Sequence, residues 1–228
     1  MKTIVLIPYR NRGEHLKYFL DNTAPKLKKQ INNLEILIVE QSDDNKLFNR
    51  GKLLNVGFQY CNNDNFFYIN HDVDLYPKNE ILNKYSIENE NNFLSIVSAH
   101  NLSLGGIIKF KGKLFRKING FRNDIWGWGN EDRDLYYRSK FKGIKCDRII
   151  EKLIQGGKFR KNFSTIKHKS NENQLNKKLR KKIESIYNSC NNDMINKFIN
   201  ESGLNNLEFV VLNEEVINDY IKRIKVNI

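Results

Sequence analysis

Long hydrophobic runs are absent from this 228-residue chain. No stretch reaches the 18 or so apolar residues that a membrane-spanning helix needs. The apolar residues 1–8 are too short for a signal peptide and lead directly into a charged motif, so we interpret them as a first β-strand. With 39% hydrophobic and 11% aromatic residues, the chain can bury a substantial core. We therefore expect one domain over residues 1–228.

Cysteine is scarce as well. Cys61, Cys146 and Cys190 are odd in number and show no metal-ligand spacing. The sequence therefore has neither a disulfide framework nor a recognisable zinc motif. We expect reduced, structural thiols in a cytosolic protein.

Acidic residues are few beside basic ones, 26 against 39, and the formal net charge is +13. Much of the excess lies in residues 158–182, where Glu172 is the single acid. A solvated lysine-rich face explains much of it. The alternatives are an anionic lipid surface, an acidic glycan acceptor or nucleotide phosphates. We do not expect nucleic acid as a partner, because the charge is not laid out as a readable helix or a recognised binding module.

The first half of the chain alternates strand and helix patterns. Apolar runs predict strands at residues 3–7, 34–39, 66–69 and 94–98, and helical patterns lie at residues 14–20 and 48–60. This order favours an α/β fold with a mostly parallel sheet and ligands at the carboxyl ends of the strands. Further along, we expect strands at 107–110, 207–212 and 221–226, and helices at 111–118 and 131–140.

Two groups of residues are candidates for metal and phosphate chemistry. Asp72 and Asp74 come after the strand at 66–69, where both carboxylates can turn into one cleft and hold Mn²⁺ or Mg²⁺. A diphosphate could be bound by the planar guanidinium groups of Arg10, Arg12 and Arg50, each of which has several N–H donors. The structural alternatives are a turn in which an aspartate caps the next helix, and surface arginines at helix ends.

A tryptophan loop precedes an acidic helix start. Trp126 and Trp128 lie between glycines, and Glu131, Asp132 and Asp134 follow. The helix dipole alone can explain the acidic residues, and core packing can explain Trp126. A glycine loop carrying two indoles is nevertheless typical of a surface that covers a sugar ring. Together with the aspartate pair, it predicts a metal-dependent enzyme acting on a sugar nucleotide.

In this order, the motifs resemble the beta-1,4-galactosyltransferase family, glycosyltransferase family 7. The match covers residues 3–226, and its His-Asp-Val-Asp form is closest to the xylosylprotein branch. The segments that carry it are residues 7–12, 48–58, 71–77, 105–106, 119–121 with 126–132, and 203–207.

The resemblance implies a GT-A type fold, with a mixed, mostly parallel sheet flanked by helices. It also implies a UDP-sugar donor, a Mn²⁺ cofactor with Mg²⁺ as substitute, and inversion at the anomeric carbon. Residues 1–100 would bind the nucleotide sugar, and residues 101–228 would form the acceptor-binding and lid half.

The resemblance also assigns roles by position. Asp74 and His168 would ligate the metal, Asp132 would be the catalytic base, and Glu131 would contact sugar. Taken without the resemblance, His168 is an ordinary surface histidine. The donor site would be formed by Pro8, Tyr9, Arg10, Arg12, Phe48, Arg50, Asp72, Val73, Gly106 and Trp128.

The chain departs from the family at three places. Thr165 or Ser170 stands where a third metal ligand is usual, which leaves a hydroxyl or water to complete the shell. Arg133 replaces an acceptor-site aspartate, and Ser103 stands where one branch has a tyrosine that tunes the donor sugar. Arg133 and the lysine-rich segment point to an acidic acceptor.

We therefore expect galactose transfer from UDP-galactose to a sugar hydroxyl, with a β1,4 linkage as the family default. The alternatives are transfer of N-acetylgalactosamine or another hexose, and an inactive carbohydrate-binding relative. Because the chain starts at the first catalytic strand, we expect a cytoplasmic form. It would touch the inner face of an anionic membrane where lipid-linked acceptors sit.

Overall fold

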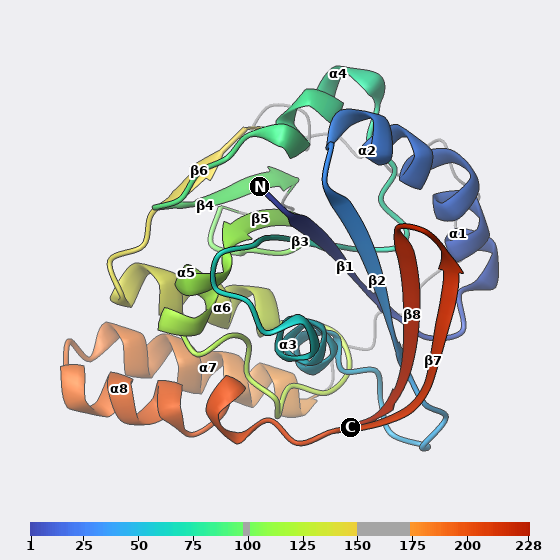
Figure 1. Cartoon of the computed structure of the whole chain (residues 1–228). Coiled ribbons are helices and arrows are strands. Elements are labelled where there is room, and N and C mark those ends of the chain that lie inside the picture. Colours follow the sequence, from blue (N-terminus) through green and yellow to red (C-terminus); the bar gives the residue numbers. More distant parts are fainter. Residues whose placement is uncertain (98–100, 150–173) are drawn as a thin grey trace.

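The computed structural model describes residues 1–97, 101–149 and 174–228, the last range without the side chains of 174–176. Within them, eight strands form one sheet in the order β6-β4-β5-β3-β1-β2-β8-β7, with helices on both faces (Figure 1). Four of the seven strand pairs are parallel and three are antiparallel. The prediction of a mixed, mostly parallel α/β sheet is confirmed.

The centre of the sheet consists of three strands that the apolar runs predicted. They are β1 (Thr3–Tyr9), β2 (Leu34–Gln41) and β3 (Phe67–His71). Every residue of β1 and β3 is buried, as expected of parallel strands that are covered on both faces. β1 pairs in parallel with both of the others, so the carboxyl ends of all three lie at one edge.

The sheet continues beyond β3 with changed strand directions. β5 (Ile107–Lys111) is antiparallel to β3 and to β4 (Phe93–Val97), and the short β6 (Cys146–Arg148) runs parallel to β4. The start of β5 therefore lies at the edge where β3 ends, and His71 pairs with Ile107. This reversal brings the glycine pair before β5 next to the aspartate turn after β3.

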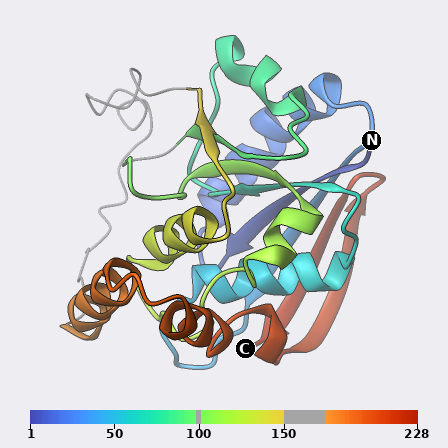
Figure 2. The ribbon, with the colours of Figure 1, turned by 90° about the vertical axis from the view of Figure 1, so that its left-hand side faces the viewer.

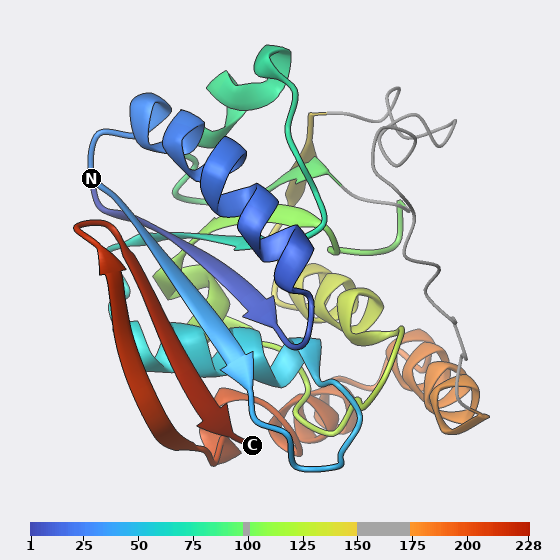
Figure 3. The same cartoon turned by 90° about the vertical axis from the view of Figure 1, so that its right-hand side faces the viewer.

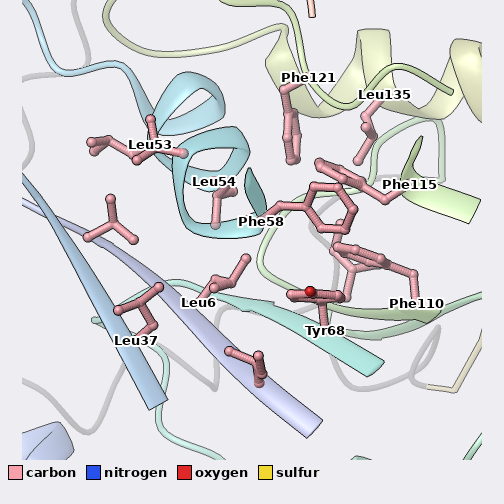
Figure 4. Packing of buried hydrophobic residues seen from close by; sticks show 14 of the residues in the cluster. Leu6, Leu37, Leu53, Leu54, Phe58, Tyr68, Phe110, Phe115, Phe121 and Leu135 are labelled. Carbon is pink, nitrogen blue, oxygen red and sulfur yellow. The ribbon is translucent and has the colours of Figure 1, made fainter. Parts of the chain in front are cut away.

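Two helical layers bury the two faces of the sheet. α1 (Gly13–Tyr18), a π-helical turn (Phe19–Thr23), α2 (Ala24–Gln30) and α4 (Asn79–Leu82) lie on one face, and η2 (Asn83–Ser86) follows α4. α3 (Arg50–Cys61), α5 (Gly112–Lys117) and α6 (Glu131–Phe141) lie on the other. Figure 4 shows Phe58 of α3 between Tyr68 of the sheet and Phe115 of α5. The rings interlock at centroid distances of 4.9 and 5.0 Å, which fixes α3 over the sheet.

The C-terminal part adds helices beside α6 and a hairpin at the sheet edge. α7 (Gln174–Asn188) and α8 (Asn192–Asn200) lie next to α6 (Figure 2), and a 3₁₀ turn (Leu204–Asn206) follows. β8 (Ile221–Asn227) pairs in parallel with β2, as residues 221–226 predicted. The other expected strand was misplaced. β7 spans Val210–Asn218 rather than 207–212, because Leu207 and Phe209 pack against the core while the exposed residues after them form the edge strand.

The described residues contain no helix that is long and apolar enough to cross a membrane. Cys61, Cys146 and Cys190 are all free thiols, as predicted. The division of the chain into halves at residue 100 stays a prediction.

Candidate functional site

The carboxyl ends of β1 and β3 bring two arginine–aspartate pairs together. Nη1 of Arg12, which follows β1, lies 2.9 Å from Oδ2 of Asp74. Nε of Arg50, the first residue of α3, lies 2.6 Å from Oδ1 of Asp72. Figure 3 shows the end of β1 and the start of α3 at the same edge of the sheet. Four predicted site residues therefore lie close together, although Arg12 and Asp74 are 62 positions apart in the sequence.

The turn that carries the aspartates is held from three sides. The carbonyl of Asp72 accepts from the Leu75 N–H at 3.1 Å and lies 2.9 Å from Nδ1 of His71. The Asp72 N–H donates to the carbonyl of Gly106 at 3.3 Å. Gly106 has φ +71°, and a Cβ there would meet the carbonyl of Val97 at 2.6 Å. Glycine is therefore needed at this position for the strand start to approach the turn.

Arg50 lies at the centre of the site and is paired with several carboxylates. The side-chain carbonyl of Asn49 accepts from the Lys52 N–H at 2.9 Å, which caps α3 and sets the direction of Arg50. Burial opposes the charge of the guanidinium, but Asp72, Glu131 and Asp132 outweigh it and raise the pKa of Arg50. Nη1 of Arg50 also lies 3.7 Å from Oε1 of Glu131.

The same centre contains buried polar atoms that no described group satisfies. Nη1 and Nη2 of Arg50 and Oε2 of Glu131 are buried and have no hydrogen-bond partner. Burial and the neighbouring carboxylate of Asp132 raise the pKa of Glu131 to about 7. Burial also raises the pKa of Asp72, against the pull of Arg50. Unsatisfied donors and acceptors of this kind cost free energy until a ligand supplies their partners. The site therefore suits a polar ligand with anionic oxygens and hydroxyls.

Asp132 reaches this site from the start of α6. Its carbonyl accepts from the Leu104 N–H at 2.9 Å, which joins α6 to the segment before β5. A Cβ on Gly105 would lie 2.9 Å from Oδ2 of Asp132. The missing side chain at Gly105 thus makes room for the Asp132 carboxylate, and Glu131 beside it faces Arg50.

The two tryptophans have different surroundings. Trp126 is partly buried against the core, with the Lys46 ammonium 5.5 Å from its ring centroid. Trp128 is 65% exposed. The Gly127 N–H donates to the carbonyl of Phe48 at 2.8 Å, which joins the tryptophan loop to the segment before α3. Core packing thus accounts for Trp126, whereas most of the Trp128 side chain is exposed.

The other predicted donor-site residues lie around the end of β1. Pro8 and Tyr9 are buried in the sheet, and Val73 is buried within the aspartate turn. The guanidinium of Arg10 lies 5.6 Å from the ring centroid of Phe48 and donates to the carbonyl of Lys46 at 2.8 Å. Their contacts with UDP stay predictions, as do the roles of all the site residues.

Of the two predicted metal ligands, the structure describes Asp74, which shares its turn with Asp72. His168, Thr165 and Ser170 lie outside the described residues. Within the described part there is no group of three or more His, Cys, Asp or Glu side chains that could hold a metal. Two hard carboxylate donors on one turn fit Mn²⁺ or Mg²⁺ if substrate oxygens, water or His168 complete the coordination.

Several segments that carry the family resemblance do not line the site but support it from behind. The buried side chain of Asn55 donates to the Phe121 carbonyl at 2.8 Å and accepts from its N–H at 2.9 Å. A Cβ on Gly120 would collide with Oδ1 of Asn55, and one on Gly203 would collide with the Asn119 carbonyl. Residues 55, 119–121 and 203 therefore meet and fix the loop that leads to the tryptophans.

Sequence reasoning missed a buried ion pair that supports α6. Nε of Arg138 lies 2.5 Å from Oδ2 of Asp134, and both side chains are fully buried. Arg138 also donates to the carbonyls of Asn119 and Gly120 at 3.2 Å and of Ser202 at 2.7 Å. The i,i+4 spacing of the two charges was the available signal, but spacing alone does not distinguish a buried pair from a surface one.

Comparison with known proteins is consistent with this geometry. Residues 1–88 match the N-terminal region of glycosyl transferase group 7, and residues 89–169 match a domain of the same group described as the N-terminal domain of galactosyltransferase. Human beta-1,4-galactosyltransferase 1 is 38% identical over 156 residues, which are 64% of this chain and 39% of that protein. Human beta-1,4-galactosyltransferase 4 is 36% identical over 180 residues, 75% of this chain and 51% of that protein.

A solved structure shares the fold over nearly the whole chain. It is a Drosophila beta-1,4-galactosyltransferase 7 mutant in complex with manganese, UDP-Gal and xylobiose. It is 24% identical, with a TM-score of 0.70 over 99% of this chain and 93% of that one. The fold is thus the GT-A galactosyltransferase fold, and the chain belongs to glycosyltransferase group 7. It spans about 40 to 50% of the length of the two curated relatives.

Proposed function

We propose that this protein is an inverting, metal-dependent glycosyltransferase that moves galactose from UDP-galactose to a sugar hydroxyl of a glycan, by default in a β1,4 linkage. The observation that carries the proposal is the cluster of Arg50, Asp72, Glu131 and Asp132, with its buried unsatisfied polar atoms. The names of the relatives, and the UDP-Gal and manganese of the Drosophila complex, support the donor and the cofactor.

The geometry gives the chain's own residues distinct tasks. Asp132, above Gly105, takes the proton from the acceptor hydroxyl as that oxygen attacks the anomeric carbon from the side opposite UDP. Arg50 and Arg12 hold diphosphate oxygens with planar forks of donors. Glu131 and the exposed ring of Trp128 hold sugar. A bound Mn²⁺, held by Asp74 and His168 with Asp72 nearby, would neutralise the diphosphate and so make UDP a better leaving group.

The first test measures UDP release from four donors with Mn²⁺ or EDTA, in the presence of simple sugar acceptors. The donors are UDP-galactose, UDP-N-acetylgalactosamine, UDP-glucose and UDP-N-acetylglucosamine. We expect Mn²⁺-dependent release that favours UDP-galactose and rises with one acceptor. Failure to bind UDP even with Mn²⁺ would overturn the proposal.

A substitution separates an enzyme from an inactive carbohydrate-binding relative. Asp132→Asn should lower turnover by at least about 100-fold, because it removes the general base, and should leave UDP affinity unchanged. The control is Asp193→Asn, which changes the same charge on the exposed first turn of α8. Equal turnover in Asp132→Asn and the wild type would assign the base to another residue.

Ser103 favours N-acetylgalactosamine as an alternative donor sugar. Ser103 is buried two positions before Gly105, close to Asp132 through the neighbouring Leu104. A small side chain there leaves room for an N-acetyl group on the donor. Faster turnover of UDP-N-acetylgalactosamine than of UDP-galactose, reversed in Ser103→Tyr, would establish this alternative.

For the acceptor and the location, we propose an acidic or lipid-linked glycan and a cytoplasmic protein at the inner face of an anionic membrane. The three free thiols favour a reducing compartment. The excess of basic residues favours anionic partners. Fractionation of cells, with the protein tested for release from membranes by salt, decides the location.

A further inference from the structure

The described part of α7 presents a strongly basic surface. Its sequence contains five basic residues and one acid, Glu184, so its net charge is +4. The basic residues, Lys177, Lys178, Arg180, Lys181 and Lys182, are all exposed. We call these five residues the basic face of α7.

The opposite side of α7 is fixed to the rest of the protein. Ile183 is fully buried, and the ring of Tyr187 stacks on Tyr137 of α6 with centroids 5.1 Å apart. The Tyr187 hydroxyl lies 3.4 Å from Oδ1 of the buried Asp134. This packing holds the helix against α6 and directs the basic face outward.

A chain of charges connects the basic face with the predicted catalytic base. Oε1 of Glu184 lies 2.9 Å from Nη1 of Arg133 and 3.1 Å from Nε of Arg180. Two guanidinium groups therefore share one carboxylate oxygen, and one positive charge is left over. Arg133 directly follows Asp132, and its N–H donates to Oδ1 of Asp132 at 2.8 Å. The excess positive charge thus begins next to Asp132 and continues along α7.

We propose that the basic face of α7, together with Arg133, binds an anionic glycan acceptor, with a carboxylate or phosphate on a sugar beyond the one that reacts. This rests on the proposed glycosyl transfer and assigns the surface that binds the charged group of the acceptor. Anionic groups gain favourable interactions with several cations at once, and the surface also speeds their approach to Asp132. A neutral acceptor gains nothing from these charges.

The test compares matched glycans and matched variants. Binding to an array of neutral, carboxylated and phosphorylated oligosaccharides is measured with UDP and Mn²⁺ present. Transfer is measured for disaccharides whose non-reacting sugar is either glucose or glucuronic acid. The variant is Lys177→Gln/Lys178→Gln/Lys181→Gln. The control, Lys26→Gln/Lys29→Gln/Lys117→Gln, removes the same charge from exposed positions on α2 and α5.

In the wild type, anionic glycans should bind more tightly than their neutral counterparts, and the difference should shrink at high salt. The α7 variant should bind anionic glycans about ten times more weakly, with kcat unchanged. Neutral glycans and the control should change less than about twofold. The proposal is overturned if wild-type protein binds anionic and neutral glycans alike, or if the α7 variant weakens both equally.

Two further outcomes are distinguishable. If the α7 variant loses binding to phosphatidylglycerol vesicles but keeps the glycan preference of the wild type, the basic face is a membrane surface and the acceptor proposal is wrong. If no donor releases UDP, the proposed transferase function fails. Transfer without any preference for anionic acceptors overturns only the inference about α7.

Discussion

The Tyr85 hydroxyl lies 3.0 Å from Nε2 of His71 and holds the imidazole beside the aspartate turn. Nδ1 of His71 lies 2.9 Å from the carbonyl of Asp72, which can only accept, so Nδ1 carries the proton. Nε2 then accepts from Tyr85. Burial lowers the pKa of His71 to about 4, so the ring is neutral at physiological pH. The aspartate turn is thus positioned by a buried tyrosine from η2.

Tyr85→Phe should therefore weaken the metal site while keeping the packing of the ring. Without the hydroxyl, the buried Nε2 loses its donor, and only the contact with the Asp72 carbonyl still holds the imidazole. We expect the Mn²⁺ concentration for half-maximal activity to rise several-fold, with a loss of about 1 kcal/mol in the free energy of unfolding. The control is Tyr68→Phe, which removes a hydroxyl bonded to the Asn63 carbonyl at 3.1 Å, outside the site. If both variants change the Mn²⁺ requirement equally, the role of Tyr85 is general stability.

Gly105→Ala should disturb Asp132 directly. The added Cβ would lie 2.9 Å from Oδ2 of Asp132, closer than such atoms approach in proteins, so the carboxylate must shift. We expect kcat to fall on the order of 10-fold, since small misplacements of a reacting group are costly. Gly13→Ala is the control, because nothing lies within 4 Å of a Cβ there. Unchanged kcat in Gly105→Ala would mean that Asp132 does not act from this position.

Arg138→Met should destabilise the protein strongly. The substitution leaves Asp134 buried without its partner and removes donors from the carbonyls of Gly120 and Ser202. We expect a loss of about 3–5 kcal/mol in the free energy of unfolding, measured by denaturant titration. The double variant Asp134→Leu/Arg138→Met should recover part of it, because no unpaired charge remains. A loss below about 1 kcal/mol for Arg138→Met would contradict this account.

Glu131 should make the stability of the ligand-free protein depend on pH. Its pKa is raised to about 7 in the folded protein from an ordinary 4.5. As pH rises from 4.5 to 7, the unfolded chain loses the proton first, so stability that is present in acid is lost. Relative to Glu131→Gln, the wild type should lose on the order of 2 kcal/mol across this window.

Denaturant unfolding at several pH values measures this difference between wild type and Glu131→Gln. The control is Glu208→Gln, which changes an exposed glutamate. A difference between wild type and Glu131→Gln that stays constant from pH 4 to 8 would show that folding leaves the pKa of Glu131 at its ordinary value.

The sequence by itself determined the fold class and most of the elements. Strands such as residues 3–7 and 34–39 are continuous apolar runs, which need burial on both faces and so predict a parallel sheet. The motif order also predicted the residues of the candidate site. Arg12, Arg50, Asp72, Asp74, Glu131 and Asp132 all follow from local patterns and the family resemblance, and the structure brings them together.

Only the tertiary structure decided which charges are buried and what each touches. The sequence does not distinguish Asp134 from Asp132. In the structure, Asp134 is fully buried and paired with Arg138, whereas the carboxylate of Asp132 lies next to Gly105. Tyr85 and Gly105 gained their roles through contacts with His71 and Asp132. A local pattern encodes the propensity of a segment, whereas burial and pKa depend on neighbours that chain folding brings from afar. For that reason the sequence could predict the candidate site residues, whereas only the fold determined their burial and their pKa values.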